Sequence, residues 1–126
     1  MTTREPVRIS ESEWEVMNVV WNRAPVAAAE VAEELSERKG WAVRTTRTLL
    51  DRLVRKRAVT YEEDGKRYLY RPRVSLADCV RQASRSFRDR VFGGQPAAML
   101  MHLVQETELT SGEIAELRRL LAEKEK

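Results

Sequence analysis

Guanidinium and hydroxyl side chains gather in residues 41–73, WAVRTTRTLLDRLVRKRAVTYEEDGKRYLYRPR. At about 100° per residue, the spacing of apolar residues predicts a helix over about 43–57. Leucines occupy one side of this helix, Arg44, Thr48 and Arg55 fall opposite them, and Arg47 lies on a flank. Guanidinium groups donate to guanine edges and phosphates, and threonine hydroxyls donate to phosphates. A surface helix with a solvated charged face would show the same pattern, so the helix alone does not establish contact with nucleic acid.

A predicted hairpin follows this helix at once. Asp64-Gly65 favours a type I′ turn between two strands, and Pro72 ends the second strand because it cannot donate to a ladder. Pairing across this turn places Glu62 opposite Arg67 on one face. The other face carries apolar and aromatic side chains, namely Val59, Tyr61, Tyr68 and Tyr70. Lys66 and Arg67 lie at or beside the tip, and a helix joined to a basic hairpin is typical of the DNA-binding half of a winged helix.

The charge distribution supports a nucleic-acid partner more strongly than the total charge does. The 126 residues carry a formal net charge of only +3. Residues 10–37 hold seven acids and one base, whereas residues 38–73 hold twelve bases and four acids. Positive charge is therefore concentrated on the predicted helix and hairpin.

The sequence lacks the residues that other classes of function require. Cys79 is the only cysteine and His102 the only histidine, so we expect no metal site, and the single thiol favours a cytoplasmic location. No glycine-rich phosphate loop or pair of nucleophile and base is present, so we expect no cofactor and no enzymatic activity. No apolar run is long enough to enter a membrane.

Two further helices are predicted before the basic segment. Ser10 and Glu13 have the spacing of a capping box for a helix over about 11–22. A second helix is predicted over about 27–39 and ends at Gly40. Ala27 occupies the capping position of this second helix, where Ser or Thr would serve better.

The C-terminal third predicts three short amphipathic helices, over about 76–92, 96–106 and 111–124. Helices this short cannot all bury their apolar stripes within one small lobe, so a second copy of the chain is the simplest partner. The predicted dimerisation side chains are Leu76, Val80, Phe87, Leu100, Leu103, Ile114, Leu117, Leu120 and Leu121. We therefore predict a mostly α fold with a small β-hairpin wing. A winged helix-turn-helix would cover residues 1–73 and a three-helix dimerisation lobe residues 74–126.

Three segments together resemble the penicillinase-repressor (BlaI/MecI) family of transcriptional regulators. They are ISESEWEVMNVVW, WAVRTTRTLLDRLVRKRAV and EDGKRYLYRP, and weaker similarity continues through SFRDRVFGG and ELTSGEIAELRRLL. The resemblance implies a homodimer that binds an inverted repeat in double-stranded DNA upstream of resistance genes. It also implies a membrane sensor of β-lactam whose signal leads to proteolysis of the repressor in its C-terminal lobe.

The resemblance also assigns positions. Arg44, Thr45, Arg47 and Thr48 match the DNA-reading positions of the family, and Ala42 replaces a frequent capping Ser or Thr. The Asn–Phe bond that is cleaved in relatives matches His102-Leu103, which has different side chains. The chain ends in LLAEKEK, without the cysteine cluster of related copper-responsive repressors.

These assignments predict a DNA-binding mode. The helix over 43–57 would lie in a major groove with its first turn toward the base edges. Lys66 and Arg67 would meet phosphate or the minor groove, and Arg55 would contact phosphate or remain a solvated charge. Two alternatives stay open, namely a winged-helix regulator released by a small ligand and a winged helix that binds another protein. Clustered Arg and Thr speak against the second, since protein interfaces favour aromatic and aliphatic anchors.

Overall fold

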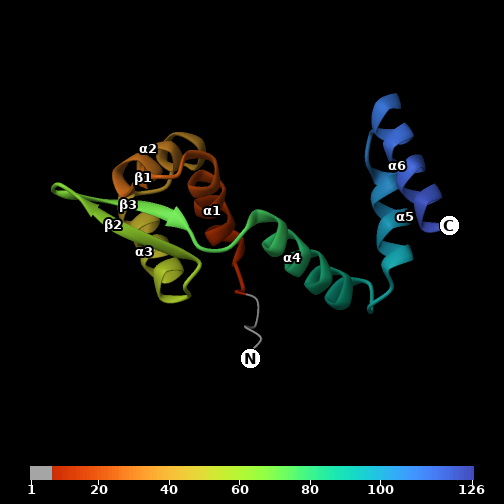
Figure 1. Ribbon diagram of the computed structural model, residues 1–126, viewed down its shortest axis with the longest axis horizontal. Helices are drawn as coiled ribbons and strands as arrows, with labels where there is room; N and C mark the ends of the chain where they lie inside the picture. Colours follow the sequence, from red (N-terminus) through yellow and green to blue (C-terminus); the bar gives the residue numbers. More distant parts are fainter. Residues whose placement is uncertain (1–6) are drawn as a thin grey trace. The chain divides into compact units, whose positions relative to one another are not determined.

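The computed structural model describes residues 7–126 and divides into two compact units, one ending at Ser84 and the other running from Arg85 to Lys126. Six helices and one three-stranded sheet follow one another along this part of the chain (Figure 1). The prediction of a mostly α chain with a small wing is confirmed. The predicted division into a DNA-binding domain ending at Arg73 and a dimerisation lobe after it stays a prediction. Residues 1–6 of the predicted DNA-binding domain lie outside the described residues.

Helix α1 (Glu11–Arg23) begins where the sequence predicts. The Ser10 hydroxyl accepts from the Glu13 backbone N–H at 3.2 Å, and the Glu13 carboxylate accepts from the Ser10 N–H at 2.8 Å. Its inner face buries Val16, Met17 and Val20. The indole of Trp21 donates to the Val74 carbonyl at 3.0 Å and so fixes the chain between the sheet and the next helix.

Helices α2 (Ala28–Lys39) and α3 (Val43–Arg55) form the helix-turn-helix. Gly40 ends α2 with a φ of 71°, a left-handed conformation that glycine adopts without strain. The two helices pack through buried side chains that form one core with α1, chiefly Val31, Leu35, Leu49, Leu50 and Leu53. Helix α3 stops two residues earlier than predicted, because Arg57 takes a left-handed φ of 65°.

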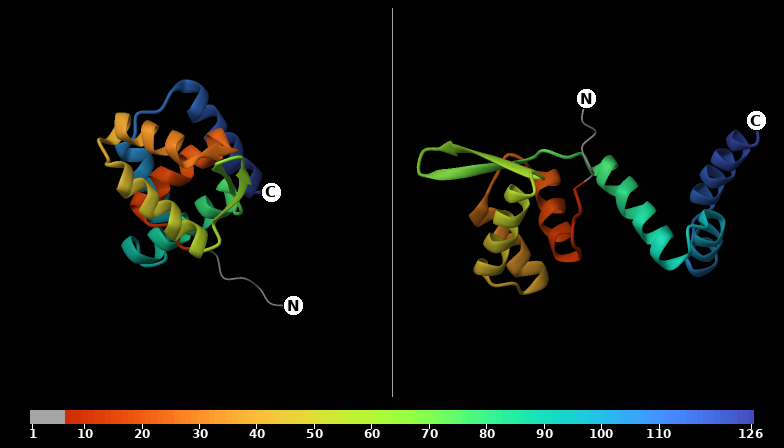
Figure 2. Two further views of the ribbon diagram at one scale, coloured as in Figure 1. Left: turned by 90° about the vertical axis from the view of Figure 1, so that its left-hand side faces the viewer. Right: turned by 90° about the horizontal axis from the view of Figure 1, so that it is seen from below.

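The sheet contains one strand more than predicted. Strands β1 (Val26–Ala27), β2 (Val59–Asp64) and β3 (Arg67–Pro72) are antiparallel in the order β1-β3-β2. The wing, defined here as β2, β3 and their turn, extends beyond the helices of its unit in both Figure 1 and Figure 2. Strand β1 pairs only with β3 at its base and is too short to leave a periodic pattern in the sequence.

The remaining helices are α4 (Leu76–Val91), α5 (Pro96–Glu106) and α6 (Ser111–Lys124), as predicted to within one residue. Ser75 caps α4 by accepting from the Asp78 N–H at 3.0 Å, and Thr110 with Glu113 forms a capping box on α6. None of residues 85–126, all of which the structure describes, is fully buried in the single chain. None of the helices described over 7–126 is both long and apolar enough to cross a membrane.

Candidate nucleic-acid interface

Helix α3 has two chemically different sides. Thr46, Leu49, Leu50 and Leu53 are buried against the core. The four residues expected to read DNA, Arg44, Thr45, Arg47 and Thr48, are all exposed. The helix therefore presents a polar, basic surface to solvent while its apolar side holds it on the domain.

The arginines of this exposed side have no acidic partner within the described residues. Arg44, Arg47, Arg52 and Arg55 form no ion pair there, whereas bases on the neighbouring helices are neutralised. Arg23, for example, contacts Glu30 at 3.4 Å and Glu34 at 3.2 Å. The uncompensated positive charge of this unit is thus concentrated on α3, where it is free to meet phosphate.

The C-terminal end of α3 is anchored to α1. The Nζ of Lys56 lies 2.6 Å from the buried Glu13 carboxylate and 2.9 Å from the Arg8 carbonyl oxygen. Burial opposes ionisation of Glu13, but the hydrogen bond and charge of Lys56 and the Ser10 N–H outweigh it and hold the Glu13 pKa below its usual value. Lys56 therefore positions the helix, whereas Arg55 beside it stays exposed and unpaired among the described residues.

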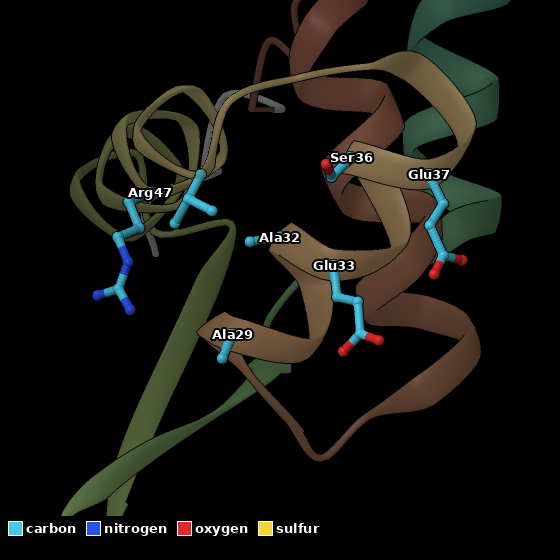
Figure 3. A pocket seen from close by; sticks show the side chains of 7 residues that line it. Ala29, Ala32, Glu33, Ser36, Glu37 and Arg47 are labelled. Carbon is cyan, nitrogen blue, oxygen red and sulfur yellow. The ribbon is translucent and has the colours of Figure 1, made fainter.

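The other end of α3 borders an acidic wall of α2. As predicted, Ala42 offers no side-chain cap to the helix. A hollow of about 400 Å³ between the two helices is lined by Ala29, Ala32, Glu33, Ser36 and Glu37 of α2 and by Val43 and Arg47 of α3 (Figure 3). Two of these lining residues, Glu33 and Glu37, are acidic, so negative charge borders the hollow that Arg47 also lines.

The wing departs from its predicted register. Asp64 pairs with Arg67 and Glu62 with Leu69, so the turn is Gly65-Lys66 and the predicted pairing of Glu62 with Arg67 is wrong. Gly65 has a φ of 68°, and Lys66 has no positive φ, which excludes a type I′ turn. The two tip bases also differ, since Arg67 contacts Asp64 at 3.7 Å while Lys66 forms no ion pair within the described residues.

The predicted aromatic face of the wing is confirmed, and it holds residues that the sequence reading did not assign to a site. The ring centroid of Tyr61 lies 4.7 Å from that of Tyr68 and 5.5 Å from that of Tyr70. Tyr70 is buried, and burial together with the Asp51 carboxylate on α3 raises its pKa. Tyr61 and Tyr68 remain 46% and 45% exposed. The signal in the sequence that could have identified them was the placement of large aromatic residues beside each other on one face of the predicted hairpin.

The nine predicted dimerisation side chains share one property. Each is between 38% and 58% exposed in the single chain. The proposed cleavage bond, His102-Leu103, lies within α5, and the His102 ring stands 6.0 Å from that of Phe92.

Cys79 is buried, and burial with the nearby Asp78 charge raises its pKa, which disfavours the reactive thiolate. Within residues 7–126, no group of three or more His, Cys, Asp or Glu is placed to hold a metal ion.

Comparison with known proteins agrees with this geometry. The family model for the penicillinase repressor matches residues 9–123. The penicillinase repressor of Bacillus licheniformis is 33% identical over 116 residues, which cover 92% of this chain and 91% of the relative. The methicillin resistance regulatory protein MecI of Staphylococcus aureus strain N315 is 34% identical, with 92% and 94% covered.

A solved structure extends the similarity to the fold of the DNA-binding domain. The solution structure of the monomeric form of Bacillus licheniformis BlaI, in complex with the blaP half-operator, matches with a TM-score of 0.53 and 33% identity. The match covers 60% of this chain and 93% of that one. With a family model over nearly the whole chain, and relatives similar along nearly their whole length, this chain belongs to the penicillinase repressor family of transcriptional repressors.

Proposed function

We propose that the protein is a homodimeric transcriptional repressor that binds an inverted-repeat operator in double-stranded DNA. The observation that carries the proposal is the exposed side of α3, where Arg44 and Arg47 lack acidic partners among the described residues and alternate with threonines. In the major groove, this side offers donors to guanine edges and to phosphates. With operator DNA as its target, the protein would act in the cytoplasm.

Dimerisation is supported by the apolar side chains of α4, α5 and α6. They are exposed in the single chain at positions such as Leu100, Leu117 and Leu121, and water contact with so many large aliphatic groups is unfavourable. A second copy carries the same stripes and would cover them. Two α3 helices would then meet two half-sites about one DNA turn apart, and the doubled phosphate contacts make binding strongly dependent on salt.

Relief of repression is the finer part of the proposal and rests on family membership. The regulated genes would be of the β-lactam-resistance type, and a membrane sensor pathway would lead to cleavage in α5, with His102-Leu103 as the matching bond. Because a protease needs extended backbone, α5 must unwind locally before it is cut. Cleavage would remove part of α5 and all of α6 from the dimer and release the half-sites.

One experiment tests both halves of this function. The protein is footprinted on the DNA upstream of its own gene, and its chain length is measured before and after exposure of the cells to β-lactam. A protected inverted repeat and a shortened chain are expected. An intact chain released from DNA would instead indicate a small ligand as the inducer, and the lack of any protected duplex would contradict the repressor function.

Base reading by α3 is tested separately. If Arg47 contacts a base edge, Arg47→Ala lowers operator binding by about 1–3 kcal/mol and relaxes specificity at one position. Binding is measured on a panel of operators with single base-pair changes. An unchanged order of preference across the panel would show that Arg47 contacts only the backbone.

A further inference from the structure

The two faces of the wing differ in what they offer to a partner. We call Tyr61, Tyr68 and Tyr70 the tyrosine face, because the register places Tyr61 opposite Tyr70 and Tyr68 is two residues from Tyr70 on the same side. Tyr61 and Tyr68 meet edge to face at 4.7 Å. Their mutual contact fixes two exposed rings before any partner arrives, which reduces the entropy lost on binding.

The tyrosine face continues the side of the sheet that packs on α3. At the base of the wing, Val59 and Tyr70 belong to the same buried cluster as Leu49, Leu50 and Leu53. Side chains alternate strictly between the faces of a strand, so Tyr61 lies on that same side where the wing extends past the helices (Figure 2). The charges of Asp51 and Arg47 act on the Tyr70 hydroxyl, which joins the tyrosine face to the exposed side of α3.

The opposite face of the wing has little net charge to offer. Arg67 contacts Asp64 at 3.7 Å, and Arg71 contacts Glu62 at 3.2 Å. On the tyrosine face, the carboxylate of Glu63 lies opposite Tyr68 in the register and is balanced in formal charge by Lys66 in the turn. Neither face is a strongly positive surface, so neutral donors on the wing can add contacts to phosphate beside the charge of Lys66.

We infer that the wing holds the sugar–phosphate backbone of duplex DNA through its tyrosine face. The hydroxyls of Tyr61 and Tyr68 donate to phosphate oxygens, and their rings pack on the neighbouring deoxyribose. This inference rests on the proposed function and gives the wing a chemistry different from the charge contacts expected of Lys66 and Arg67. Contacts from uncharged donors position the duplex against α3 and release no counterions of their own.

Phenylalanine substitutions test the hydroxyls while they keep the rings. The probe is a duplex selected by the wild-type protein from a random pool, and the dissociation constant is measured over a salt series for the Tyr61→Phe, Tyr68→Phe double variant. We expect the dissociation constant to rise at least about tenfold, since two hydrogen bonds to charged acceptors are lost. The slope of log affinity against log salt should stay unchanged, whereas Lys66→Ala should make it shallower by about 0.9 if Lys66 meets phosphate.

Matched controls separate the possible failures. Thr60→Val removes a neutral hydroxyl from the opposite face of β2 and should leave binding unchanged, and thermal unfolding checks that each variant is folded. If Arg47→Ala loses affinity while the tyrosine variant binds like wild type, this inference is overturned and the repressor function stands. If the wild-type protein selects no duplex, the proposed function and this inference fail together.

Discussion

At the scale of single residues, Thr46 has the least satisfied environment in the described part of the chain. Its side chain is fully buried near the start of α3, and the hydroxyl has no hydrogen-bond partner among residues 7–126. Thr46→Val removes the buried polar atom and keeps the shape, so we expect the free energy of unfolding to rise by about 1 kcal/mol. Denaturant unfolding measures this, with the exposed Thr45→Val as control. A destabilised Thr46→Val would mean that the hydroxyl is bonded in solution.

Glu13 gives a second prediction at this scale. Its pKa lies below the ordinary 4.5 in the folded protein, so the ion pair with Lys56 stabilises fully above pH 4.5. That contribution is lost as the pH falls through the lowered pKa. Glu13→Gln should lower the free energy of unfolding at pH 7 by about 1–3 kcal/mol, and the difference from wild type should shrink as the pH drops below 4.5.

A matched acid controls for general charge effects. Glu15 pairs with Arg38 and Lys39 on the surface of the same helix, at 3.7 and 3.4 Å. Glu15→Gln should cost less than about 1 kcal/mol, because exposed pairs contribute little. Equal losses in unfolding experiments on the two variants would contradict the special role of the buried Glu13.

At the scale of elements, the end of α3 stores backbone strain. Ala58 donates its N–H to the Leu53 carbonyl at 2.9 Å and Arg57 donates to Val54 at 3.0 Å, with Arg57 in the left-handed conformation. Helices usually place glycine there. Arg57→Gly should therefore raise the free energy of unfolding by about 0.5–1 kcal/mol, after allowance for the greater freedom of glycine in the unfolded chain.

The end of α2 provides the reverse experiment. Gly40 has a similar φ of 71° with open space around its α-carbon, so Gly40→Ala should lower the free energy of unfolding by about 1 kcal/mol through backbone strain alone. Both variants are measured by denaturant unfolding. A loss of stability in Arg57→Gly would show that the arginine side chain makes a contact that outweighs its strain.

Strong local signals made most elements predictable. The capping box of Ser10 and Glu13 marked the start of α1 correctly, and the leucine spacing of α3 predicted its buried side. The predicted register of the wing was wrong because Gly65 fits either central position of a tight turn. The observed pairing differs from the predicted one by two residues, so every side chain stays on its predicted face. Hydrophobic pattern cannot distinguish such registers. The ion pair between Lys56 and Glu13, which lie 43 residues apart in the sequence, leaves no local sequence pattern.

At the scale of the whole molecule, tight binding to the operator should depend on assembly of the dimer. A chain truncated after Met101 loses Leu103, Ile114 and Leu117, which are exposed in the single chain. Sedimentation equilibrium should show a monomer, and affinity for the full operator should fall by roughly 100-fold or more, because linked half-sites bind with high effective concentration. A chain ending at Glu123 is the control and should stay dimeric. A Met101 truncation that dimerises and binds tightly would contradict the proposed architecture.

The lack of any fully buried residue over 85–126 in the single chain has a consequence for the living cell. If that part folds only within the proposed homodimer, its folding would be a second-order process, and the survival of the repressor would depend on its own concentration. Newly made chains at low abundance would remain open to housekeeping proteases, whereas pairs would be long-lived. We therefore expect a threshold in the relation between gene expression and accumulated protein, which makes silencing of the target genes switch-like when synthesis of the repressor rises or falls.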